Sequence, residues 1–398
     1  MGSYSWGLSV QSPDNAVKLA RLVELAQALV AIPSVTNQEH EIADWAYEHL
    51  KSMGLTGVQR LPVEDSGDSV IGWIDGPAQG PALMYNFHLD TFPVCDGWNT
   101  DPFTPHLEDG RLYGLGAHDM KGGGACVLAA VEALIAAGVE LGGRLILSGT
   151  TDEENWSRGA HALIKSGLLD GCQYCLIPEP SFPATLTVGA RGRHVFHLIF
   201  RGQTSHAAYG DQGINAVVDA AKAISYLEGV DLGFDEEFGI SGSQCIIGFH
   251  GGGTLILVPE EAHVFIDRHI LPGQTVEEAA AQIETAVHKA GVASTYELAW
   301  DERPTPAPLP YVVPSDSLLV QTVKRNMERE LDQPVRLFLQ RSVADTNHFA
   351  VYGRIPTLVW GPQGGNTCQA NEYVQLDSMP AVTRTYIRSA IELLGIRS

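Results

Sequence analysis

The sequence predicts an α/β protein whose main domain is interrupted by a smaller α+β domain. Two observations predict this architecture. Short apolar runs alternate with helical patterns over the first 190 residues and again after residue 302, an order typical of a sheet covered by helices on both faces. Between these parts, residues 191–301 show the order strand, helix, strand, strand, helix, strand, which is that of a ferredoxin-like sandwich. We therefore expect residues 1–190 and 302–398 to form one domain and residues 191–301 to form the insert.

The individual elements follow from the spacing of apolar residues. Helical spacing predicts surface helices over residues 16–32, ended by Pro33, and over residues 39–53. The rest of the first part is expected to contain strands over residues 69–74, 81–87, 144–150 and 174–177, and helices over residues 120–137 and 160–166. Within the insert we expect strands over residues 193–200, 243–250, 263–270 and 294–300, and helices over residues 214–227 and 276–290. A proline-rich linker is expected over residues 304–314, followed by a helix over 318–331, a strand over 356–360 and a helix over 381–394.

The composition is that of a globular protein with a strongly acidic surface. The 398 residues include 25 Lys and Arg against 47 Asp and Glu, a formal net charge of −22, so nucleic acid and anionic membranes are not expected as partners. No apolar stretch reaches the roughly 20 residues that cross a bilayer. Six cysteines are too few for a disulfide scaffold. Because a signal-peptide pattern is also missing, we expect a cytoplasmic protein whose partner is a small-molecule substrate.

Four clusters of acidic residues and histidine each follow an apolar strand, where open α/β sheets gather their sites. The clusters contain His88 with Asp90, Asp119, Glu153 with Glu154, and Glu179. Residues two apart lie on one side of a strand, so His88 can ligate a metal ion while Asp90 orients it from behind. Asp119 lies in a glycine-rich loop that opens into a helix, where both carboxylate oxygens can face cations.

Carboxylates gathered without basic partners repel one another, and each unit of pKa shift costs about 1.4 kcal/mol. One or two divalent metal ions are the simplest means of keeping such a group ionised. Imidazole together with carboxylates suits zinc, manganese or cobalt, and of these we expect zinc first. Taken alone, His88 would be a buried structural histidine and Glu153 with Glu154 a solvated helix start. The joint order of the clusters is what indicates a metal site.

That joint order is the most specific feature of the sequence. It reads HxD at residues 88–90, GxGxxDMKGG at 114–123, DEE at 152–154 and Glu-Pro at 179–180. It resembles the co-catalytic zinc metallo-aminoacylase and peptidase family, which includes acetylornithine deacetylase, succinyl-diaminopimelate desuccinylase, aminoacylase and glutamate carboxypeptidase. The likeness covers nearly the whole chain. It implies a metallopeptidase-like catalytic domain with a mixed central sheet, an inserted lid or dimerisation domain, and a homodimer.

The resemblance also implies roles for the site residues. Asp119 would bridge two metal ions, with His88 and Glu179 on the first ion and Glu154 on the second. Glu153 would be the general base, which takes the proton of a metal-activated water and returns it to the departing nitrogen.

Two residues of the insert have implied roles as well. His206, in the segment Gly-Gln-Thr-Ser-His-Ala-Ala, would polarise the scissile carbonyl, often in the active site of a dimer partner. Arg268 is expected to grip a substrate carboxylate, although His269 stands where many relatives have a second arginine. Ile256 replaces an asparagine that is common in the family, so one polar contact to the substrate is missing.

Two further positions leave alternatives open. Cys368 stands four residues before Glu372, where family members usually have a histidine that ligates the second ion. Either the Cys368 thiolate replaces this histidine, because thiolate is a good zinc ligand, or the second ion is weak or absent. An offset of one residue would put Gln369 at this place instead. His118 is expected to be a solvent-facing loop residue, with a contact near the metal or the substrate as the alternative.

The sequence therefore predicts a metal-dependent amidohydrolase that cleaves an N-acyl or C-terminal peptide bond of a small amino-acid-like substrate. A second hypothesis is a hydrolytic deaminase that releases ammonia from an electron-poor aromatic amine or a ureido carbon. A third is a non-catalytic binding or scaffold protein that has kept the fold. Retention of His88, Asp119, Glu153, Glu154 and Glu179 argues against the scaffold.

Overall fold

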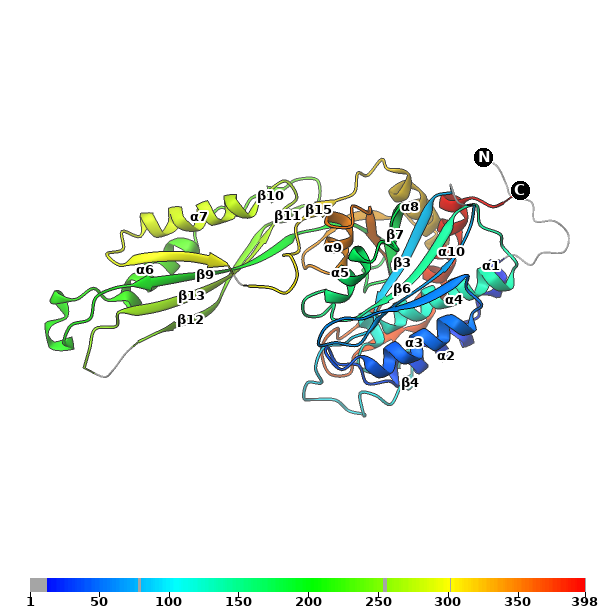
Figure 1. The fold of residues 1–398 in the computed structure, drawn as a ribbon, viewed down its shortest axis with the longest axis horizontal. Coiled ribbons are helices and arrows are strands. Elements are labelled where there is room, and N and C mark those ends of the chain that lie inside the picture. The colour runs from blue at the N-terminus through cyan, green and yellow to red at the C-terminus, as the bar shows by residue number, and fades with distance from the viewer. Residues whose placement is uncertain (1–12, 78–79, 253–255, 301, 398) are drawn as a thin grey trace. The chain divides into compact units, whose positions relative to one another are not determined.

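The computed structural model describes residues 13–77, 80–252, 256–300 and 302–397 (Figure 1). The chain forms two compact units. The first unit comprises Met1–Gly189, Val313–Phe338 and Ala344–Ser398, and the second comprises Ala190–Val312 and Leu339–Val343. The start of the chain, before residue 13, lies outside the described residues.

The central sheet of the first unit is mixed, as the family resemblance implied. Its strands run in the order β1 (Gly57–Leu61), β2 (Ser69–Ile74), β6 (Arg144–Thr150), β3 (Ala82–His88), β7 (Cys172–Ile177), β17 (Thr357–Val359) and β8 (Thr185–Ala190). The four strands β6, β3, β7 and β17 are parallel, and antiparallel strands flank them on both sides. All seven residues of β3 are buried, so this strand lies in the middle of the core.

Helices cover this sheet on both faces (Figure 1). One face packs against α4 (Gly122–Ala136) and α10 (Met379–Leu394), with α2 (Leu19–Val30) and α8 (Leu318–Leu331) beside them. The other face packs against α3 (His40–Ser52), α5 (Arg158–Lys165) and α9 (Asp345–Val351). A small antiparallel sheet has the order β18 (Gly364–Gly365), β19 (Tyr373–Gln375), β5 (Arg111–Tyr113) and β4 (His106–Glu108). α4 is buried on nearly all sides, and apart from Glu132 it contains only apolar or small residues.

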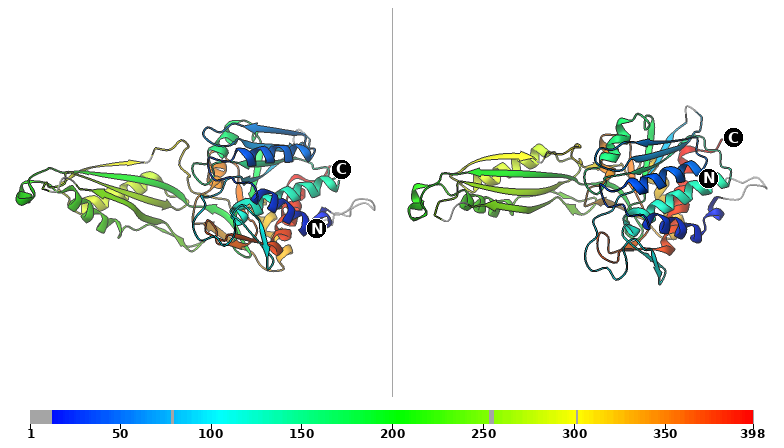
Figure 2. Two further views of the ribbon diagram at one scale, coloured as in Figure 1. Left: turned by 90° about the horizontal axis from the view of Figure 1, so that it is seen from below. Right: turned by 60° about the horizontal axis from the view of Figure 1, so that its bottom comes forward.

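The second unit is an antiparallel sheet covered by two helices on one face (Figure 2). The sheet has the order β12 (Ser243–Gly251), β13 (Glu261–Ile270), β9 (Gly192–Arg201) and β14 (Thr295–Trp300). The helices are α6 (Ala216–Leu227), whose N-terminus is capped by Asn215, and α7 (Val276–Lys289), which begins with a Thr275–Glu278 capping box. All six elements lie within two residues of the predicted ranges, because each has a clear apolar period.

Several boundaries differ from the predicted ones. The first predicted helix, residues 16–32, corresponds to α2, which begins only at Leu19 because Lys18 is extended. A separate short helix, α1 (Pro13–Ala16), precedes it. The helix expected from residue 120 starts at Gly122, after the irregular turn η1 (Ala117–Lys121). Strands β1 and β8 were not predicted. The remaining elements are β10 (Phe234–Asp235), β11 (Ile240–Ser241), β15 (Tyr311–Val312), β16 (Arg336–Gln340), η2 (Ala207–Gln212) and η3 (Leu376–Ser378).

The second unit is also larger than the expected insert of residues 191–301. It takes in most of the proline-rich linker and residues 339–343. Backbone hydrogen bonds account for both additions. The Arg193 N–H donates to the Pro308 carbonyl at 2.9 Å, and the Arg191 N–H donates to the Gln340 carbonyl at 3.0 Å.

Candidate metal centre

Three of the predicted site segments meet at one edge of the central sheet. His88 is the last residue of β3, the Glu153–Glu154 pair follows the end of β6, and Glu179 follows the end of β7. These three strands are parallel neighbours, so their carboxyl ends lie side by side. The irregular turn η1 before α4 brings Asp119 to the same place.

The first group of ligand atoms is formed by His88, Asp119 and Glu179. Nε2 of His88 lies 3.3 Å from Oδ1 of Asp119 and 3.6 Å from Oε1 of Glu179. The three ligand atoms lie within 4.8 Å of one another. One imidazole nitrogen and two carboxylate oxygens at this spacing can hold a divalent ion.

The second group is formed by Asp119, Glu154 and Cys368. Sγ of Cys368 lies 3.6 Å from Oδ2 of Asp119, and the ligand atoms again lie within 4.8 Å of one another. The two oxygens of Asp119 thus face different groups, as expected for a bridging carboxylate. Cys368 therefore contributes its sulfur as a possible ligand in this group.

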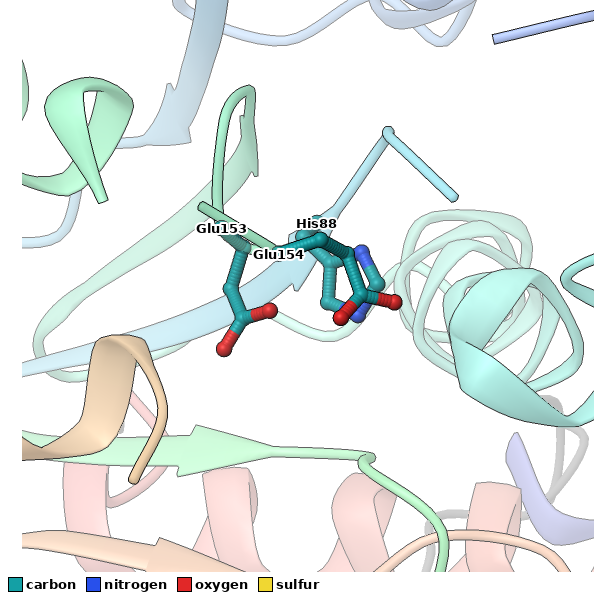
Figure 3. A group of neighbouring side chains, drawn as sticks. All are labelled: His88, Glu153 and Glu154. Carbon is teal, nitrogen blue, oxygen red and sulfur yellow. The ribbon is translucent and has the colours of Figure 1, made fainter. Parts of the chain in front are cut away.

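Glu153 and Glu154 also form a group with His88. Figure 3 shows the three side chains pointing in the same general direction. Asp90 holds this pair in place. Its Oδ1 accepts the N–H of Glu153 and its Oδ2 the N–H of Glu154, both at 3.1 Å. Its carboxylate is 3.7 Å from Nδ1 of His88, whereas its backbone carbonyl is at 3.0 Å. The orientation of His88 therefore comes mainly from the carbonyl of Asp90, and the carboxylate expected to do this positions the two glutamates.

Glu372 is a site residue to which the sequence analysis gave no role. Its carboxylate accepts three backbone N–H groups of the loop that carries Asp119: Gly116 at 3.0 Å, His118 at 2.9 Å and Asp119 at 2.8 Å. The two segments lie more than 250 positions apart in the chain. A contact of this separation leaves no local pattern in the sequence, so only the fold could find it.

His118 lies in the interior, which corrects its expected place in solvent. Its side chain is buried, and its Nδ1 lies 2.8 Å from Oγ1 of Thr367. A Cβ at Gly364 would meet the imidazole ring at 2.6 Å, so the loop containing Gly364 covers the ring closely. Burial lowers the pKa of His118.

The two insert residues have different surroundings. His206 is exposed in the second unit, and its Nδ1 accepts the N–H of Ala208 at 3.1 Å. Arg268 is only 1% exposed and donates to the side-chain oxygens of Gln244 and Gln282. It lies on the helix-covered face of β13, because alternate residues of this strand are buried. This placement does not fit the expected contact of Arg268 with a substrate carboxylate.

The electrostatics of the site fit a divalent cation. Burial, followed by repulsion from neighbouring carboxylates, raises the pKa values of Glu153, Glu154 and Glu179 well above their usual range. Burial opposes protonation of His88, but the surrounding carboxylates outweigh it and raise the pKa of this imidazole. Among the described residues, the buried Oε1 of Glu154 has no hydrogen-bond partner. A cation would neutralise this charge and occupy that oxygen. The donor set of imidazole, carboxylates and one thiol suits zinc, cobalt or manganese.

Comparison with known proteins agrees with this geometry. The model of peptidase family M20/M25/M40 matches residues 84–392. The chain belongs to this family. As an M20-family member it is a metal-dependent hydrolase that acts on C–N bonds, which confirms the predicted enzyme class. Amide-bond hydrolysis is thus the one of the three hypotheses that the family supports.

Similar sequences and structures cover nearly the whole M20-family chain. Succinyl-diaminopimelate desuccinylase from Halorhodospira halophila is 28% identical, covering 95% of this chain and 99% of the relative. The enzyme of the same name from Wolinella succinogenes is 26% identical over 83% of this chain and 89% of the relative. A tripeptidase structure from Staphylococcus aureus has a TM-score of 0.79 at 20% identity, covering 95% of this chain and 99% of that one. A dinuclear metal-binding peptidase from Bacillus subtilis has a TM-score of 0.72 at 17% identity, covering 94% and 98%.

The remaining expectations concern location and assembly. Within the described part of the chain, none of the helices has the length and apolar character needed to cross a membrane. The homodimer, the cytoplasmic location and the identity of the metal stay predictions.

Proposed function

We propose that this M20-family protein removes an N-acyl group, or cleaves a C-terminal peptide bond, from a small amino-acid-like substrate, with Glu153 as the general base. The observation that carries the proposal is the pair of ligand groups that share Asp119 and lie beside Glu153. The desuccinylase names of the sequence relatives and the tripeptidase name of a structural neighbour support the substrate class.

The ligand groups divide between two ions. His88, Asp119 and Glu179 would hold the first ion, and Asp119, Glu154 and Cys368 would hold the second. A bound divalent ion supplies Lewis acidity, which lowers the pKa of water towards about 7 and polarises a carbonyl. The rest of the chemistry belongs to the side chains around these groups.

Glu153 is suited to move a proton in both directions. Its Oε1 accepts the N–H of Asp345 at 3.3 Å, which fixes the carboxylate beside the ligand groups. Burial, and then repulsion from Asp345, raises its pKa well above the usual value of a glutamate. A carboxylate with a raised pKa takes a proton from the attacking water more readily and can then return it to the departing amide nitrogen.

His206 is suited to donate a hydrogen bond to the substrate carbonyl. Because its Nδ1 accepts a backbone N–H, the neutral ring carries its proton on Nε2. That nitrogen is a donor on an exposed side chain. We therefore assign to His206 the stabilisation of the oxygen that becomes negative during attack.

The test is the Glu153→Gln variant of the zinc-loaded protein. A panel of N-succinyl and N-acetyl amino acids, dipeptides and tripeptides would be screened for released amine, carboxylate and ammonia. We expect kcat of the variant to fall by about 100- to 10,000-fold with the metal content unchanged. Glu48→Gln, an exposed glutamate paired with Lys51, is the matched control. Full activity of Glu153→Gln would contradict the assignment of the base, and release of ammonia without a carboxylate product would favour the deaminase.

A further inference from the structure

The two ligand groups that share Asp119 differ in chemistry. The group with His88 offers one nitrogen and two carboxylate oxygens, whereas the group with Glu154 offers two carboxylate oxygens and the sulfur of Cys368. Of the six cysteines, all free thiols, Cys368 alone belongs to such a group among the described residues. Nitrogen and oxygen ligands accept manganese as well as zinc, but thiolate sulfur favours the softer ions.

The loop around Cys368 is built to hold the sulfur in place. Asn371 accepts the Asn99 N–H at 2.8 Å through Oδ1 and donates to the Gly97 carbonyl at 3.2 Å through Nδ2. Within the loop, Nδ2 of Asn366 donates to the carbonyl of Asn371 at 3.1 Å. These contacts fix the chain on both sides of Cys368, so its sulfur faces Asp119 without depending on a bound ion.

The size of the group also suits a thiolate ligand. Sγ of Cys368 and Oδ2 of Asp119 are 3.6 Å apart. Zinc binds sulfur at about 2.3 Å and carboxylate oxygen at about 2.0–2.2 Å, so ligand atoms around one ion lie roughly 3.5 Å apart. The buried Oε1 of Glu154, which has no hydrogen-bond partner among the described residues, is available as the third ligand.

We propose that Asp119, Glu154 and Cys368 form a thiolate metal position that selects zinc, cobalt or cadmium over manganese, whereas the position with His88 accepts manganese as well. This inference rests on the proposed metal-dependent function. On binding, the S–H bond of Cys368 breaks, its proton leaves to the solvent, and the sulfur donates an electron pair to the ion. The two positions would therefore fill with different metals from a mixed supply.

Cobalt binding to the full-length protein tests the proposal without an activity measurement. Apoprotein would be titrated with Co²⁺, recording the thiolate-to-cobalt charge-transfer absorption in the near ultraviolet and the number of bound ions by native mass spectrometry. We expect two ions per chain and a charge-transfer band. Cys368→Ser should lose the band and bind the second ion at least about 100-fold more weakly, because loss of an outer-shell partner already costs about 10- to 100-fold and Cys368 is a direct ligand in this proposal. Cys368→His should bind two ions without the band.

The experiment also includes manganese binding and a control variant of a second cysteine. The unchanged protein should bind one Mn²⁺ tightly, and Cys368→His should bind two. Cys245→Ser, an exposed cysteine outside the ligand groups, should behave as the unchanged protein. Two bound cobalt ions without the band, or a band that survives Cys368→Ser, would overturn the thiolate position while leaving the proposed function intact. Failure of every form to bind any ion would overturn both.

Discussion

Replacing Gly123 by alanine would test how the start of α4 is joined to the metal centre. Gly123 lies in the first turn of this helix, directly against the segment that carries Glu179. A Cβ at this position would lie 2.0 Å from the carbonyl oxygen of Pro178 and 2.9 Å from its carbonyl carbon. The obstacle is backbone, so a side-chain rotation cannot relieve it.

Two opposing effects decide the sign of the change in stability. Alanine in place of a helical glycine gains about 1 kcal/mol from helix propensity. Against this, the new Cβ falls about 1.4 Å short of the 3.4 Å that marks ordinary contact, so α4 or Pro178 must move by a comparable distance. Overpacking of this kind costs about 1–3 kcal/mol, and more when backbone must move. We expect a net loss of about 1–2 kcal/mol in the free energy of unfolding of the metal-free protein.

The affinity for metal should be more sensitive to this displacement than the free energy of unfolding is. Glu179 follows Pro178 directly, and ligand distances in metal sites are held to about ±0.2 Å. A shift approaching 1 Å next to Glu179 should therefore weaken the ion held with His88. Urea unfolding and competitive zinc titration would measure the two effects. The control is Gly229→Ala, whose Cβ would meet nothing closer than 3.6 Å. A Gly123→Ala variant with unchanged zinc affinity and increased stability would refute this account.

Three further predictions concern charge. In the metal-free protein, the free energy of unfolding should fall as the pH rises from about 5 to 7. Buried carboxylates such as Glu179 have folded-state pKa values well above the 4.5 of the unfolded chain, so the folded apoprotein binds more protons. Urea unfolding at several pH values with EDTA or with zinc would check this, and the same pH dependence in both would contradict it. Glu132→Gln should lower the free energy of unfolding by about 1–2 kcal/mol at pH 6, after allowance for solvent screening. The loss should shrink as the pH falls from 4.5 towards 2, because the ion pair with Arg21 lowers the pKa of Glu132 to about 2. Unfolding curves of both proteins at several pH values would show whether the difference disappears. Arg268→Lys should lower the free energy of unfolding by about 1–2 kcal/mol and leave KM unchanged, because the partners of Arg268 are two glutamines of the second unit. A large rise in KM would instead show that Arg268 binds the substrate.

The sequence predicted the architecture well where a local period exists. In β13, Ala262, Val264 and Ile266 are buried at every second position, and this alternation marked the strand. The same alternation places Arg268 on the buried face, so the sequence already contained the signal that its side chain points away from solvent. The family pattern outweighed this signal in the sequence analysis.

His88, Glu154 and Glu179 could be predicted as ligands because each follows an apolar strand, and Asp119 because it lies in a glycine-rich loop. Cys368 was predicted only from the family resemblance. The residues that hold these ligands in place could not be predicted. Glu372 and the buried position of His118 depend on the chain returning to the loop of Asp119 after hundreds of residues. Asp90 was expected to contact His88 through its carboxylate, but two neighbouring N–H groups compete for those oxygens. Such competition is decided by the fold and leaves no trace in residue spacing.

The dependence of the Asp119 loop on Glu372 bears on the moment at which the enzyme can acquire its metal. During synthesis, the segments that carry His88, Glu154 and Glu179 leave the ribosome long before Cys368 and Glu372. The six main elements of the second unit are complete by Trp300 and can pack while the first unit still lacks its last helices. A growing chain therefore has the carboxylates but not the anchored loop. The loop becomes anchored only after the chain has been made as far as Glu372 and this residue has docked against it, so we expect the complete metal centre to form after that point.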